Sequence, residues 1–351
     1  MTVPEPPADR FRMPAEWEPH AGTWLAWPHR RSDWPGKFAP VRWVYGEIVR
    51  TLARFEPVNV ICRDAEQRAE ARRVLALAHA DPANVHFHLC PNDRGWVRDN
   101  GPIFAKDTAG GRAVLDFGFT AWAKYPDWEV DDRIAGFVAG VRGLPAVRPT
   151  VRGHRVVLEG GSIDVNGAGV MLTTEEGLLS EVQQRNPPFS RADYEAVFDQ
   201  YLGCRKTIWL NRGIVGDDTH GHIDDLARFV GTRTVVTAVE ANEADDNYAP
   251  LRENLDRLRA ATDADGRKLE VVELPMPAPL WFRKQRLPAS YANFYIANGV
   301  VIAPTFNDPA DRRALGVLAD LFPGREVVGI HCVDLVWGLG TLHCMTQQEP
   351  A

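Results

Sequence analysis

Short apolar strands recur along this chain at a nearly constant spacing. Anchored on Trp24, Ile103, Val170, Val235 and Val300, they lie 79, 67, 65 and 65 residues apart. Between them the pattern predicts amphipathic helices and further strands, and polar segments follow the helix–strand pairs. A regular period of this length is typical of repeat architectures. The spacing therefore favours about five α/β units in a ring, in which each unit directs a polar loop toward one axis.

A serial βαβ sheet, wound on both faces, is the alternative topology for such an alternation. Against it, no glycine-rich phosphate loop joins a first strand to a first helix. No long linker or low-complexity tract divides the chain. We therefore predict a single domain over residues 1–351, with residues 1–10 as a flexible tail.

Three helix–strand pairs can be placed from their end signals. The best-defined helix begins after Ser190, an N-cap with Asp193 at the third helical position, and ends at Gly203. A strand is predicted directly after it. The same signals predict further helix–strand pairs within residues 251–274 and 309–330.

The net charge and the cysteine content argue against several classes of binding partner and of structural site. A net charge of −7 argues against nucleic acid or an anionic membrane and is compatible with a cationic substrate. The five cysteines are odd in number and lack CxxC spacing, which predicts neither a disulfide framework nor a structural zinc site. We find no signal peptide and no span long enough to cross a bilayer, so we expect a reduced, cytoplasmic protein.

The last stretch of the chain carries the candidate nucleophile. Residues 338–348 are rich in glycine, amide, histidine and cysteine, which suits a packed site better than a solvated tail. Cys344 follows His343 and comes shortly after Gly340, whose small size lets the chain approach a ligand. A second His-Cys pair ends at Cys332, directly after an apolar strand, and we interpret that cysteine as core.

A second polar segment contains His222 and Asp224. If this segment is extended, both side chains point to one face and address one ligand. A hydrogen-bonded loop is the plainer alternative. His220 completes a His-x-His-x-Asp spacing that resembles metallohydrolase ligands, but the residue after the aspartate is Asp225 rather than histidine. Without another histidine cluster, a metal site is not favoured.

Two further carboxylates stand in short motifs. Asp99 suits a turn, and equally suits a carboxylate that accepts two N–H bonds from a planar cation, with Trp96 as a stacking wall. We expect Arg98 to steady that carboxylate. Glu159 lies between an apolar run and two glycines, so it is either solvated or a buried acid that keeps a histidine charged. The sequence leaves both choices open.

Together these segments resemble the agmatine deiminase family, also called the Porphyromonas-type peptidylarginine deiminase family, within the guanidino-group-modifying superfamily. The likeness runs nearly end to end. It is carried, in order, by residues 13–20, 96–102, 158–162, 172–176, 184–187, 221–224, 290–295 and 343–348.

The resemblance implies a five-unit, pseudo-symmetric α/β propeller of the pentein type, in agreement with the repeat. It implies a small cationic guanidine as partner, no metal or organic cofactor, and an expected homo-oligomer. The roles it implies are the nucleophile for Cys344, the general acid and base for His222, guanidinium clamps for Asp99 and Asp224, the partner of His222 for Glu159, and substrate contacts for Trp96 and Gly340.

The implied reaction is hydrolysis of agmatine to N-carbamoylputrescine and ammonia through a thiouronium on Cys344. Some positions depart from the family form. The terminal loop has Leu339 and Thr341 where glycine and asparagine are expected, the segment before Trp96 is one residue longer, and His220 and Asp225 differ. Arginine, peptidyl-arginine and other alkylguanidines therefore stay open as substrates. A metal-dependent amidohydrolase, an amidinotransferase and a non-enzymatic ligand-binding propeller are the other classes considered.

Overall fold

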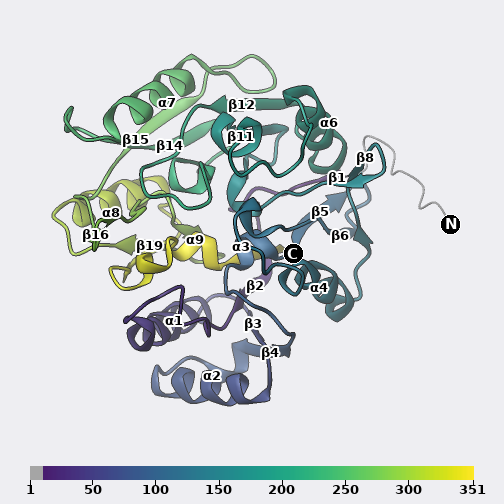
Figure 1. The fold of residues 1–351 in the computed structure, drawn as a ribbon, viewed down its shortest axis with the longest axis vertical. Helices are drawn as coiled ribbons and strands as arrows, with labels where there is room; N and C mark the ends of the chain where they lie inside the picture. Colours follow the sequence, from purple (N-terminus) through teal and green to yellow (C-terminus); the bar gives the residue numbers. More distant parts are fainter. Residues whose placement is uncertain (1–10) are drawn as a thin grey trace.

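The computed structural model describes residues 11–351, and its fold is a mixed α/β arrangement of many small sheets (Figure 1). Residues 1–10, for which a flexible tail is predicted, lie outside the described residues. The helices are α1 (Phe38–Leu52), α2 (Ala65–Leu77), α3 (Val97–Asn100), α4 (Ile134–Arg142), α5 (Glu175–Leu179), α6 (Arg191–Leu202), α7 (Tyr248–Ala260), α8 (Ala310–Leu321) and α9 (Leu342–Met345).

The strands of the described region form five sheets of three or four strands and two hairpins. In spatial order the larger sheets are β21 (Gln347–Pro350), β2 (His20–Ala26), β3 (Val58–Cys62), β4 (Val85–Leu89); β1 (Phe11–Arg12), β5 (Ile103–Asp107), β6 (Arg112–Leu115), β7 (Ala146–Val147); β10 (Asp164–Val165), β11 (Val170–Thr174), β12 (Lys206–Leu210); β13 (Ala227–Phe229), β14 (Thr234–Val239), β15 (Glu270–Pro275); and β18 (Tyr295–Ile296), β19 (Val300–Thr305), β20 (Glu326–His331). The hairpins pair β8 (Thr150–Val151) with β9 (His154–Arg155) and β16 (Trp281–Phe282) with β17 (Gln285–Arg286).

The five predicted anchor strands lie in five separate sheets, as β2, β5, β11, β14 and β19. Four of them share one pattern: the anchor is antiparallel to one neighbour and parallel to the strand that follows its helix. In the second sheet β6, rather than the predicted β5, occupies this position, because β6 pairs antiparallel with β5 and parallel with β7. The longer first spacing in the sequence reflects the additional helix α2 and strand β4 in the first unit.

Helix α6 confirms the end signals in the sequence. Ser190 and Asp193 form the reciprocal capping box, and Gly203 closes the helix in the left-handed conformation, with φ of 67°. The predicted pairs α7–β15 and α8–β20 are also present. Figure 1 shows these longer helices around the edge of the molecule, with the short helices α3 and α9 near its middle.

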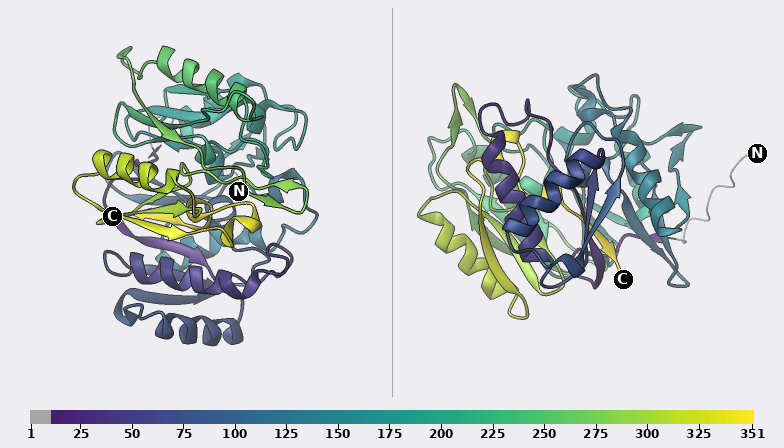
Figure 2. Two further views of the ribbon diagram at one scale, coloured as in Figure 1. Left: turned by 90° about the vertical axis from the view of Figure 1, so that its left-hand side faces the viewer. Right: turned by 90° about the horizontal axis from the view of Figure 1, so that it is seen from below.

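The C-terminal strand lies beside a strand from the N-terminal part of the chain. Strand β21 pairs antiparallel with β2, and all of its residues are buried, which confirms that the C-terminal stretch is packed. Figure 2 shows α1 and α2 in purple and blue at one end of the long axis and α7 in green at the other. Among residues 11–351, no helix combines the length and apolar character that crossing a membrane would need.

Candidate active site

Cys344 lies on α9 and lines a cavity of about 350 Å³. The side chain is 6% exposed. Its Sγ accepts a hydrogen bond from Asn293 Nδ2 at 3.1 Å and donates one to Asp224 Oδ2 at 3.6 Å. Burial and the nearby carboxylates Asp224, Asp225 and Asp99 raise the pKa of the Cys344 thiol well above its ordinary value. The ligand-free protein therefore holds a neutral thiol, and a bound cation would favour its ionisation.

Gly340 is required by the close packing around Cys344. A Cβ atom at this position would lie 2.9 Å from the Trp96 ring and 3.2 Å from Cys344 Sγ. Gly340, Trp96 and Cys344 all line the cavity. The preceding Leu339 also lines it and has a φ of 68°, a backbone region that favours glycine. This is the position at which the family resemblance led us to expect glycine.

Asp99, on α3, also lines the cavity, and its carboxylate is held from two sides. Trp122 Nε1 donates to Oδ2 at 2.9 Å, and the Gly161 amide donates to Oδ1 at 3.0 Å. Burial raises the pKa of Asp99 to about 6, with Asp224 and Glu159 adding to the effect against the opposing influence of His222. The carboxylate is thus destabilised in the ligand-free protein, and a cationic ligand would relieve this.

The prediction that Arg98 steadies Asp99 is wrong. Arg98 points away from the cavity, where it donates to Gln348 Oε1 at 2.7 Å and to the His343 carbonyl at 3.3 Å. Adjacent residues on an α-helix point about 100° apart, so on the single turn of α3 Asp99 lines the cavity while Arg98 contacts the buried interior. Trp122, from a distant segment, takes the role that we expected of Arg98.

His222 lies between two carboxylates. Its Nδ1 is 3.7 Å from Asp99 Oδ1 and its Nε2 is 3.6 Å from Glu159 Oε2, which are ion-pair rather than hydrogen-bond distances. Burial lowers the pKa of His222, but Asp99, Glu159 and Asp224 outweigh it and raise the pKa to about 9. The sequence left an extended segment and a hydrogen-bonded loop open here, and the structure has a 3₁₀ turn, Ile223–Asp225, directly after His222.

Glu159 is a buried acid, which resolves the alternatives that the sequence left open. Arg185 Nε donates to its carboxylate at 3.1 Å. Burial opposes ionisation, yet Arg185 and His222 lower the pKa of Glu159 to about 2. Glu159 therefore stays charged and stabilises the protonated form of His222.

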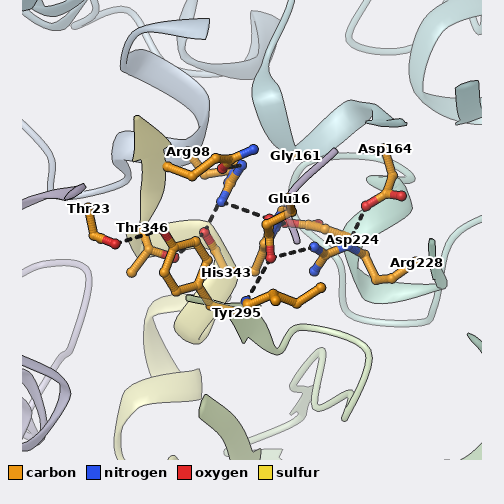
Figure 3. Close-up of polar contacts among 12 residues, drawn as sticks. Glu16, Thr23, Arg98, Gly161, Asp164, Asp224, Arg228, Tyr295, His343 and Thr346 are labelled. Carbon is orange, nitrogen blue, oxygen red and sulfur yellow. Dashed lines mark hydrogen bonds and ion pairs between the residues drawn. The ribbon is translucent and has the colours of Figure 1, made fainter. Parts of the chain in front are cut away.

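Asp224 contacts Cys344 on one side and His343 on the other. His343 Nδ1 lies 2.7 Å from Asp224 Oδ2 (Figure 3). Burial opposes ionisation of Asp224, but His343 and other cations lower its pKa. Asp224, His222 and Glu159 are buried beside the cavity rather than lining it.

The arrangement does not favour a metal site. His220 Nε2 lies 3.1 Å from Ser180 Oγ rather than beside His222. Within residues 11–351, no three or more His, Cys, Asp or Glu side chains are grouped to hold a metal ion. Burial, together with Asp224 and Asp217, raises the pKa of Asp225 well above its usual value. The charges that remain beside Cys344 suit an organic cation.

Sequence reasoning missed several supporting residues. They are Glu16, Trp122, Arg185, Arg228, Asn293 and His343, which contact the predicted site residues or their partners. Glu16, Arg185, Asn293 and His343 lie inside motifs that carry the family resemblance. Their positions therefore held a signal, but their partners depend on long-range contacts.

The chain is similar over nearly its whole length to a known family of deiminases. The model of the Porphyromonas-type peptidyl-arginine deiminase family matches residues 12–350. The chain belongs to this family. Among family members, the agmatine deiminase of Pseudomonas aeruginosa (strain LESB58) is 38% identical over 369 aligned positions, covering 99% of this chain and 97% of that protein.

Solved structures of related deiminases share the fold. The agmatine deiminase of Enterococcus faecalis aligns with a TM-score of 0.92 at 33% identity, covering 100% of this chain and 98% of that one. An agmatine deiminase of C. jejuni with substrate bound aligns with a TM-score of 0.86 at 30% identity, covering 97% of this chain and 96% of that one. These two deiminases align over nearly the whole chain, including the segments that carry the cavity residues.

Proposed function

We propose that this protein hydrolyses the guanidinium group of agmatine to N-carbamoylputrescine and ammonia, as a hydrolase acting on the C–N bonds of linear amidines. The observation that carries the proposal is a cysteine at the wall of a cavity, with buried carboxylates beside it and a histidine held between two of them. Relatives named agmatine deiminase over nearly the whole chain support the choice of substrate.

Asp99 and Asp224 bind the guanidinium in this proposal. A guanidinium is a weak electrophile because its charge is delocalised over three nitrogens. Two carboxylates fix its plane and draw charge toward their own side, so that the central carbon is held near Cys344. Trp96 borders the cavity and contributes an aromatic wall to the cation.

The first half-reaction forms a bond between Cys344 Sγ and the guanidinium carbon. The bound cation favours ionisation of Cys344: the thiol proton passes to solvent, and the thiolate attacks to give a tetrahedral adduct. His222, protonated in the ligand-free protein, gives its proton to one terminal nitrogen, and that C–N bond breaks to release ammonia. A cationic thiouronium remains on Cys344, and His222 is left neutral.

The second half-reaction returns the enzyme to its starting state. Neutral His222 takes a proton from water as the water oxygen attacks the thiouronium carbon. The C–S bond then breaks, and the proton lost from the new hydroxyl converts ammonia to ammonium. The ureido product leaves, and the Cys344 thiolate takes a proton back from solvent. One water is consumed and one ammonium is formed for each guanidinium.

We further propose a cytoplasmic protein whose residues 1–351 form one domain, a five-unit α/β propeller that assembles into a homo-oligomer. The separate location of the five anchor strands supports the five units. The partner is a small cationic guanidine, and neither nucleic acid nor a membrane is expected to bind.

Two residues that differ from the expected family form line the cavity, so substrates with a different group beyond the guanidinium stay open. Arg94 stands in the segment that is one residue longer, and Leu339 replaces a glycine. Either side chain can contact the part of the substrate beyond the guanidinium. Free arginine and peptidyl-arginine are therefore the comparison substrates.

The test is release of ammonia and ureido product from agmatine, arginine and a peptide arginine, with Cys344→Ala as control. We expect turnover of agmatine, loss of all turnover in the variant, and a mass increase on Cys344 equal to agmatine minus ammonia after rapid quenching. Preference for arginine would replace the substrate. Turnover that survives Cys344→Ala and is lost to a chelator would support a metal-dependent amidohydrolase instead.

A further inference from the structure

Behind Asp224 lies a group of six charged side chains, which we call the buried charge cluster. Its members are Glu16, Arg98, Asp164, Asp224, Arg228 and His343 (Figure 3). Each is at most 7% exposed. None of them except Asp224 was assigned a role above, although burying six charges is costly unless they are paired. The cluster therefore needs an explanation beyond packing.

His343 is the centre of the cluster because each ring nitrogen meets a carboxylate. Nδ1 lies 2.7 Å from Asp224 Oδ2, and Nε2 lies 2.8 Å from Glu16 Oε2. An ionised carboxylate only accepts hydrogen bonds, and a neutral imidazole has a single N–H. Two hydrogen bonds to two ionised carboxylates require protons on both ring nitrogens.

Glu16 has no place for the extra proton. Its Oε1 accepts the Ile296 amide at 2.8 Å and lies 2.9 Å from Arg228 Nη2, while its Oε2 faces His343 and Arg98 Nη2 at 3.3 Å. Donors thus surround both oxygens, which favours the ionised carboxylate. The proton that the geometry requires therefore belongs to His343.

The charge count of the cluster agrees with this assignment. Glu16, Asp164 and Asp224 supply three negative charges, and Arg98 and Arg228 supply two positive charges. A doubly protonated His343 brings the sum to zero, whereas a neutral ring would leave an uncompensated buried carboxylate. Asp164 is itself held by the Arg228 side chain and by the Phe229 amide at 2.8 Å.

The two oxygens of Asp224 are used unequally. Oδ2 faces His343 and the Cys344 thiol. Oδ1 is buried and has no hydrogen-bond partner among residues 11–351. The peptide of His343 is anchored too, since its amide donates to Asn293 Oδ1 at 3.0 Å and its carbonyl accepts from Arg98. His343 therefore holds Asp224 with its ring, and its own anchored backbone fixes the peptide next to Cys344.

We propose that His343 is a positioning residue: an imidazolium, held by Glu16, that fixes Asp224 through Oδ2 and so keeps Oδ1 free for the guanidinium. This inference rests on the proposed function for the identity of the ligand. In this inference His343 acts on the substrate only through Asp224 and does not touch the substrate itself. Its prediction runs against simple electrostatics, because removing a positive charge near a cationic ligand should otherwise tighten binding.

The experiment compares His343→Gln and Glu16→Gln with the matched control His20→Gln. His20 is also a buried histidine beside a carboxylate, with Nδ1 3.2 Å from Glu56 Oε1, but its Nε2 faces the Glu16 carbonyl at 2.7 Å. We expect KM for agmatine to rise on the order of tenfold, and kcat/KM to fall on the order of 100-fold, in His343→Gln. Glu16→Gln should follow in the same direction, and His20→Gln should stay within about twofold in KM.

A second readout does not depend on turnover. In folded protein labelled with ¹⁵N-histidine, both ring nitrogens of His343 should carry a proton, with the His343 signals assigned by their loss in His343→Gln. A His343 ring with a single proton would overturn the inference, as would an unchanged or lowered KM in a folded His343→Gln protein. If the wild type turns over no guanidine, the proposed function fails, and the labelling experiment still decides the state of His343.

Discussion

The chain contains the dipeptide His-Cys twice, and the two copies lie in very different surroundings. His331 ends strand β20 on the exposed surface, and Cys332 is fully buried, in an apolar cluster that also reaches Cys344. His343 is buried between two carboxylates, and Cys344 lines the cavity. Identical neighbours in sequence thus give one core thiol and one candidate nucleophile.

Burial alone does not distinguish the two thiols. It raises the pKa of Cys332 well above its usual value, and burial with nearby carboxylates does the same for Cys344. The difference lies in access and in charge. Cys344 faces a cavity whose neighbouring carboxylates can recruit a cation, and that cation can then offset the cost of forming the thiolate.

The largest expected effect separates the two cysteines directly. Cys344→Ser should lower kcat with agmatine by more than about 10³-fold, because a hydroxyl is a far poorer nucleophile here. Cys332→Ser should leave kcat within about threefold and lower the free energy of unfolding by about 1–3 kcal/mol, since it buries a hydroxyl in the core. Steady-state kinetics and urea unfolding measure both. A folded, inactive Cys332→Ser protein would reverse the assignment.

A smaller loss of activity is expected when the carboxylate near each His-Cys pair is replaced. Asp224→Asn should lower kcat/KM on the order of 10²–10³-fold, because a neutral amide leaves the cationic substrate and His343 without their counter-charge. Asp311 is the matched control near Cys332: it accepts hydrogen bonds from Tyr291 Oη and the Phe306 amide. Asp311→Asn should change stability but leave kcat/KM within about threefold. Equal losses in both variants would remove the distinction between the regions.

The smallest effect concerns stability and pH. The pKa of His222 in the folded protein is about 9, above the value of 6.5 for an unperturbed histidine. Its protonation therefore stabilises the fold fully below pH 6.5, and this contribution, roughly 3 kcal/mol, is lost as pH rises through 9. His222→Gln should show a correspondingly flatter fall in unfolding free energy between pH 6.5 and 9.

The exposed histidine of the first pair provides the control for that measurement. His331→Gln should reproduce the wild-type pH dependence, because His331 lies at the surface. Urea unfolding at several pH values compares the three proteins. A His222→Gln slope equal to that of the wild type would contradict the raised pKa of His222.

Local patterns were sufficient for much of the fold and for the choice of candidates. The capping box at Ser190, the left-handed Gly203 and the buried faces of α6 and α7 depend on residues within a few positions of one another. The same holds for the distinction between Cys332 after an apolar strand and Cys344 after a glycine-rich loop. Such short-range features can be interpreted without coordinates.

The partners of the site residues could not be predicted in this way. Arg98 turns toward Gln348, 250 positions away, rather than toward its neighbour Asp99. The sequence left the segment after His222 as either extended or a hydrogen-bonded loop, and only the structure shows the 3₁₀ turn Ile223–Asp225. Local propensity is overridden where buried polar groups must be paired.

By itself, then, the sequence determined the α/β units and the family, and it predicted which thiol, imidazole and carboxylates form the site, because these depend on residue type and short spacing. The tertiary structure alone decided which charges meet. His343 contacts Asp224 across 119 positions and Glu16 across 327. The protonation of each buried group depends on such distant neighbours, since its pKa is determined by burial and by charges within a few ångströms.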